Sequence, residues 1–124
     1  MQTLTGIRNS SQSDLVISEI RSALLEAQAK TSNNIPTGVY FQNDRYTYFE
    51  GAVYNPSDPE NLVTVLPSGY SFSSINLPSS TAQFNKLTRQ LIGFTDPSEV
   101  VMSETGGTSK TISINRWGVI EISE

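Results

Sequence analysis

The fold is decided by the stretch DLVISEIRSALLEAQAK, residues 14–30, in which apolar residues recur with the spacing of an α-helix. These apolar residues form one stripe: Val16, Ile17, Ile20, Ala23, Leu24 and Ala27. Ser13 or Asp14 can cap the helix, and the spacing of Ser11 and Asp14 resembles a capping box. Pro36 blocks its continuation. We therefore expect a long N-terminal amphipathic helix.

Downstream of this helix the apolar residues alternate with a period of two, which predicts β-strands. We expect strands at 38–42, 46–50, 62–66, 70–75, 82–84, 90–94, 100–102, 110–114 and 119–122. Turns are expected at 43–45, 67–69 and 115–118, where Gly, Asn and Asp gather. One helix followed by successive strands predicts an α+β fold, with the helix packed on one or more antiparallel sheets.

Length and composition limit the class of protein. The 124 residues suit one domain, which we place at 13–124, and residues 1–12 are either a stub of a longer helix or residues foreign to the natural chain. The chain has no Cys and no His, which excludes thiol chemistry and an imidazole base. A net charge of −4 makes nucleic acid an unlikely partner. The first residues contain neither an apolar membrane segment nor a signal peptide, which leaves open a natural segment upstream of Gln2.

Paired carboxylates are the only candidate catalytic groups in the sequence. Asp58 with Glu60, and Asp96 with Glu99, are of the type that serves glycoside hydrolysis or calcium binding. Both pairs lie in loops rich in Pro and Ser, where Asp commonly caps a turn, and neither has EF-hand spacing. The sequence therefore predicts no catalytic residue, no metal ligand and no cofactor, and we expect no enzyme.

Aromatic and cationic residues leave two binding hypotheses open. An aromatic platform for sugars or bases would be built from Tyr40, Tyr46, Tyr48, Phe49 and Trp117, although alternate aromatic residues usually fill the core of a sheet. A nucleic-acid patch would need the fold to bring together Lys86, Arg89, Lys110 and Arg116. The ordinary interpretation of such scattered charges is a solvated surface.

The order of segments resembles the soluble domain of minor pilins and pseudopilins of the GspH/FimT type. The resemblance covers most of the chain and is carried by EAQAK at 26–30, VYF at 39–41, YTYF at 46–49, LPSG at 66–69 and ISINRWGVIEI at 112–122. These segments are similar to the family's Ala-rich helix, its first hairpin, its Leu-Pro-x-Gly turn and its closing hairpin. The chain departs from the family at its start, where no prepilin cleavage site and no apolar anchoring segment are visible.

The resemblance implies a pilin-like head and a structural subunit of a type IV pilus or a type II secretion pseudopilus. Its partners would be other pilin or pseudopilin subunits, at the cell surface or in the periplasm. Contact with the inner membrane before assembly would need an N-terminal segment that this sequence lacks. The alternative is a binding module at the cell surface, either a DNA-uptake minor pilin or an adhesin.

A pilin helix must face its own head on one side and neighbouring subunits on the other. At 100° per residue, a second helix face away from the core stripe holds Leu15, Ser18, Ser22, Leu25 and Ala29, and the same angle adds Leu4, Ile7 and Ser11 upstream. Glu19, Glu26 and Lys30 lie on a third side. Small residues let helices approach closely, so we expect a subunit-packing face here. The alternative is that these are ordinary exposed residues, because scattered surface Leu is common.

Overall fold

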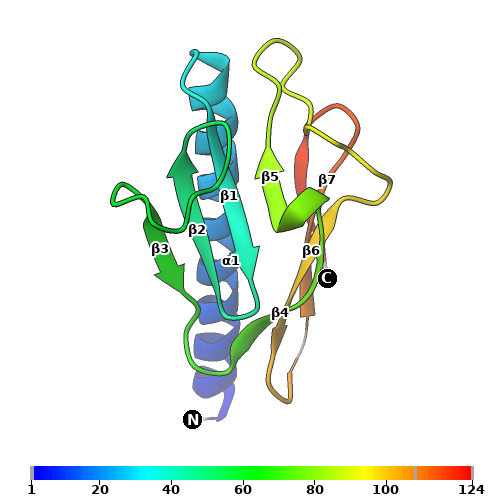
Figure 1. Ribbon diagram of the computed structural model, residues 1–124. Helices are drawn as coiled ribbons and strands as arrows, with labels where there is room; N and C mark the ends of the chain where they lie inside the picture. Colours follow the sequence, from blue (N-terminus) through cyan, green and yellow to red (C-terminus); the bar gives the residue numbers. More distant parts are fainter. Residues whose placement is uncertain (1, 108, 124) are drawn as a thin grey trace.

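Helix α1 (Gln2–Ser32) runs the length of the molecule behind the first β-hairpin, as the computed structural model shows in Figure 1. The structure describes residues 2–107 and 109–123, with side chains from Gln12 onward. The predicted core stripe is confirmed, because Val16, Ile17, Ile20, Leu24 and Ala27 are buried and Ala23 is partly buried against the same core. The helix is thus held by its apolar stripe.

The predicted start of the helix at Ser13 or Asp14 is wrong, because α1 already begins at Gln2. Ser13 is buried within the helix, and the carboxylate of Asp14 accepts a bond from Lys110 Nζ at 2.7 Å. Gly6 and Asn9 weaken a helix without stopping it, and no proline interrupts the segment. Both expected capping residues are therefore interior positions of α1.

The helix ends where Asn34 takes a left-handed conformation with φ of 70°. The amide of Ile35 donates to the carbonyl of Lys30, and the amide of Asn34 donates to that of Thr31. This is the Schellman arrangement, which satisfies carbonyl groups that the helix leaves without partners. Asn34 thus ends the helix two residues before Pro36.

Within the described residues the strands form two antiparallel sheets of four strands each, which confirms the α+β class. Sheet A has the order β3-β2-β1-β5 and contains β1 (Thr37–Gln42), β2 (Arg45–Glu50), β3 (Leu62–Val65) and β5 (Thr81–Gln83). Sheet B has the order β4-β6-β7-β8 and contains β4 (Tyr70–Asn76), β6 (Glu99–Glu104), β7 (Ser109–Ile114) and β8 (Ile120–Ser123). A short 3₁₀ helix, η1 (Pro78–Ser80), precedes β5. Helix α1 packs across both sheets.

The predicted strand at 90–94 is wrong. Only Leu91 pairs there, in an isolated bridge with Phe84. Gly93 turns the chain with a φ of +74°, a conformation that breaks a strand. The segment is therefore a loop that crosses the end of β5.

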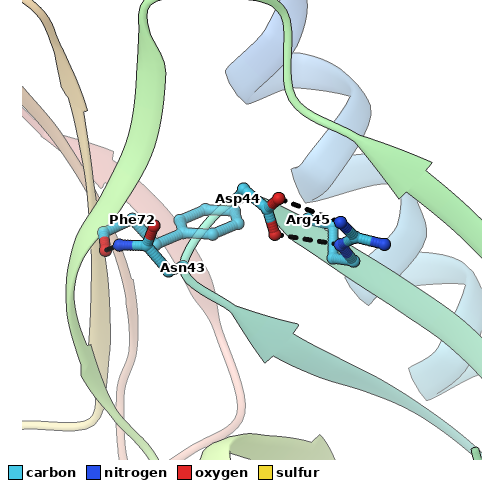
Figure 2. Close-up of polar contacts among 4 residues, drawn as sticks. All are labelled: Asn43, Asp44, Arg45 and Phe72. Carbon is cyan, nitrogen blue, oxygen red and sulfur yellow. Dashed lines mark hydrogen bonds and ion pairs between the residues drawn. The ribbon is translucent and has the colours of Figure 1, made fainter.

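The turn between β1 and β2 ties the two sheets together. The carbonyl of Asn43 accepts the amide of Phe72 at 2.8 Å, and the carbonyl of Asp44 accepts the amide of Leu66 at 2.9 Å. Figure 2 shows the side-chain contacts at this corner: Asn43 reaches the carbonyl of Phe72, and Arg45 donates two bonds of 2.9 Å to the Asp44 carboxylate. One hairpin turn thus positions both the end of β3 and the start of β4.

Candidate functional site

The second face of α1 is exposed to solvent. Its described members are Leu15, Ser18, Ser22, Leu25 and Ala29, which we call the α1 outer face. Leu15 is 59% exposed and Leu25 is 42% exposed, and both lie on the side of the helix opposite the buried stripe. The side chains of Leu4, Ile7 and Ser11 lie outside the described residues, although the helical backbone continues through them. Two leucines separated by small residues make this face suitable for close packing of another helix.

An acidic groove runs beside this face, between α1 and strands β2 and β3. Its volume is about 470 Å³, and its carboxylates come from Glu19, Glu26, Glu50 and Glu60. Lys30 is the one cationic residue among those that line the groove, and its Nζ lies 3.8 Å from Oε1 of Glu50. Burial raises the pKa of the Tyr48 phenol, and the negative charge of Glu26 raises that pKa further. The groove therefore presents negative charge toward solvent next to the edge of sheet A.

The cationic residues proposed as a nucleic-acid patch do not meet at one place. Lys86 Nζ donates to Asn34 Oδ1 at 3.1 Å, just beyond the end of α1. Gln28 Nε2 donates to the carbonyls of Arg89 and Gly118, at 2.8 Å each, which places the loops carrying Arg89 and Arg116 side by side.

Lys110 instead binds Asp14, fourteen residues earlier on the same helix than Gln28. At 1.5 Å per residue the two anchor points are about 21 Å apart. The structure therefore brings the loops that carry Lys86, Arg89 and Arg116 to the C-terminal end of α1 and leaves Lys110 elsewhere.

The paired carboxylates serve the loops in which they lie. Asp58 Oδ1 accepts the amide of Glu60 at 2.9 Å, so this pair closes a turn. Asp96 precedes a proline in a surface loop, and Glu99 begins β6. Among the described residues, no group of three or more acidic, His or Cys side chains is arranged to hold a metal ion.

The aromatic residues considered as a platform are divided among different surfaces. Tyr46 and Tyr48 face α1, whereas Tyr40 and Phe49 alternate to the other side of sheet A. There the ring of Tyr54 stacks on Tyr40 at 4.0 Å and covers Phe49. Trp117 is exposed in the turn before β8. Their arrangement fits the core-filling interpretation better than a shared platform.

No family model, curated protein or solved structure matches this chain. The resemblance to pilins therefore stays a prediction from the sequence. Within the described residues, no helix combines the length and the apolar character that a membrane span requires.

Sequence reasoning missed the exposure of β3. The run Leu62-Val63-Thr64-Val65 has the composition of a buried strand, yet Leu62, Val63 and Val65 are 64%, 54% and 58% exposed. β3 lies at the edge of sheet A, and its side chains are exposed on both faces of that sheet. The acidic side of the groove was detectable in the sequence, because Glu19 and Glu26 are seven residues apart and therefore lie on the same side of a helix.

Proposed function

We propose that this chain is a structural subunit of the minor pilin or pseudopilin type, which packs against other such subunits in a type IV pilus or a type II secretion pseudopilus. The observation that carries the proposal is the α1 outer face, an exposed row of Leu15, Ser18, Ser22, Leu25 and Ala29 on a helix whose opposite face is fully used by the core. Its place of action is the cell surface or the periplasm. No catalytic step is part of the proposal.

The dimensions of α1 support this role. Thirty-one residues at 1.5 Å each give a rod of about 46 Å, and its N-terminal end extends beyond the β1–β2 hairpin in Figure 1. A head mounted on one side of a long helix leaves the other side free along its length. Subunits that repeat one head-to-tail contact without closing a ring build a helical filament.

Placing charged side chains on the α1 outer face tests the proposal. In the natural host, the double variant Leu15→Glu with Leu25→Glu should abolish incorporation into filaments, because buried carboxylates without partners oppose helix packing. Leu87→Glu is the matched control, since Leu87 is 84% exposed on the loop after β5 and is not part of the α1 outer face, so this variant should assemble normally. Thermal unfolding of the purified chain should show little change for either variant. Normal assembly of the double variant, or loss of its fold, would contradict the proposal.

A DNA-binding module at the cell surface is the second candidate, favoured because the loops that carry Lys86, Arg89 and Arg116 lie at one end of α1. If duplex DNA binds there, a gel-shift titration should give a salt slope that falls by about one unit for each of these residues changed to Ala. Lys110→Ala should leave the slope unchanged, because Lys110 lies elsewhere. Equal effects of all four changes would indicate nonspecific attraction instead.

A further inference from the structure

Strand β3 is the open edge of sheet A, and its pairing with β2 determines which of its backbone groups point to solvent. It pairs with β2 alone, from Tyr48 with Leu62 to Arg45 with Val65. The amide of Leu66 donates to Asp44, so alternate residues before it, Thr64 and Leu62, also direct their backbone groups toward β2. The amide and carbonyl groups of Val63 and Val65 therefore point away from the sheet, toward solvent.

The other described edge of sheet A is blocked, which sets β3 apart. The carbonyl of Gln83 in β5 accepts the amide of Ile92, so the loop after β5 covers that edge. Natural sheets usually protect an exposed edge with charged residues, a proline or a bulge. None of these three devices occurs in Leu62–Val65, whose pairing with β2 is also regular, and its short length of four residues is the one protective feature that this strand has. β3 is thus a ready template for another strand.

The two sides of this edge differ in charge. Leu62 and Thr64 face α1 and line the acidic groove, where Glu19, Glu26 and Glu60 have no ion pair within the described part of the chain. Val63 and Val65 face the other side of sheet A, where Arg45 lies opposite Val65. A strand added to β3 would place alternate side chains on these two sides.

We propose that β3 binds an extended segment of another protein by strand addition, and that this segment alternates basic with apolar residues. Its basic side chains lie over the acidic groove, and its apolar side chains pack beside Val63 and Val65. Its backbone bonds to the outward amide and carbonyl groups of these two valines. This mode of recognition takes affinity from backbone hydrogen bonds and specificity from alternate side chains.

A second copy of the chain does not meet this requirement. β3 contains no basic residue, so pairing two β3 strands would bring two acidic grooves together. Like charges placed opposite each other destabilise strand pairing. The Lys and Arg residues of this chain nowhere alternate with apolar residues, so the occupant that fits the edge is a different protein, and this interaction goes beyond the proposed role of the α1 outer face.

The first experiment uses a capped peptide of about six residues that alternates Lys and Val, titrated into the isotope-labelled chain and followed by amide NMR shifts. The largest shifts should fall on Val63 and Val65, and binding should weaken as salt is added. Glu26→Gln should weaken binding by about two- to fivefold, as expected for one exposed ion pair. A peptide with Glu in place of Lys should not bind.

The second experiment separates strand addition from charge attraction alone. Val63→Pro removes an amide that points to solvent and leaves the bonds to β2 intact, so the chain should stay folded and lose the peptide. Val63→Thr keeps that amide and should bind with little change. The double variant Leu15→Glu with Leu25→Glu should also keep peptide binding, so failure of the filament proposal would not affect this result.

Three outcomes would overturn the inference. One is equal binding of the peptide by Val63→Pro and the unchanged chain. Another is a set of shifts confined to residues outside β3 and the acidic groove. The third is self-association of the chain without peptide, abolished by Val63→Pro, which would make a second copy the occupant.

Discussion

Gln28 joins three separate parts of the chain through one side-chain amide. Its Nε2 donates to the carbonyl of Arg89 and to that of Gly118, so the helix holds the loop after β5 against the turn before β8. The approach is so close that a Cβ on Gly118 would lie 2.1 Å from the carbonyl oxygen of Arg89. Both the left-handed φ of +81° and the lack of space require glycine at this position.

Gly118→Ala should therefore lower the free energy of unfolding by about 2–3 kcal/mol, since backbone strain and a backbone clash act together. Gly69→Ala is the matched control: Gly69 also has a positive φ of +91°, yet no atom lies within 4 Å of its added Cβ. In that variant only the unfavourable backbone conformation should act, which should lower the free energy of unfolding by about 1 kcal/mol. Urea denaturation of both variants measures the difference, and equal losses would show that the close contact is unimportant.

The hydrogen bonds from Arg45 hold the pKa of the Asp44 carboxyl below its usual value. A carboxyl whose pKa is lower in the folded chain contributes stability above its ordinary pKa, and that contribution is lost as the pH falls through the folded pKa. Arg45→Gln should bring the pKa of Asp44 back up toward its usual value. A carboxyl-carbon NMR titration measures the change, and an identical titration curve in both proteins would contradict the assigned cause.

At the scale of the element, α1 shows which features of a helix a sequence pattern can predict and which it cannot. The buried stripe was predictable because it repeats with the helical period. The start of α1 was not predictable, because Ser and Asp have side chains that can cap a helix, and the sequence does not show that Ser13 and Asp14 lie inside one. The predicted strand at 90–94 was wrong because Gly93 turns the chain there, although the other residues of this segment favour a strand.

Adjacent leucines on α1 give a direct test of its two faces. Leu24 is buried in the core, so Leu24→Ala should cost about 2–5 kcal/mol of stability. Leu25 belongs to the exposed outer face, and Leu25→Ala should change stability by less than about 1 kcal/mol. Thermal or urea unfolding compares the two variants under one condition. A large loss for Leu25→Ala would mean that this side chain is part of the core.

At the scale of the whole molecule, the α+β class could be inferred from the order of the periodic segments, whereas the division into two sheets could not. The pairing of β4 with β6 joins residues far apart in sequence, and no local pattern encodes which strands meet. For the same reason the sequence identified β3 as a strand without showing that it forms an edge. The α1 outer face was foreseen because it depends only on the geometry of one helix.

Site-specific cross-linking in cells of the natural host most directly tests the claim that the α1 outer face packs against other subunits. The chain contains no cysteine, so single variants Leu15→Cys, Ser22→Cys and Leu25→Cys report on one position each, with Leu87→Cys as the control. We predict cross-linked species between subunits for the three helix positions and monomer alone for Leu87→Cys. Monomer alone at all three helix positions, in cells that assemble filaments, would contradict the claim.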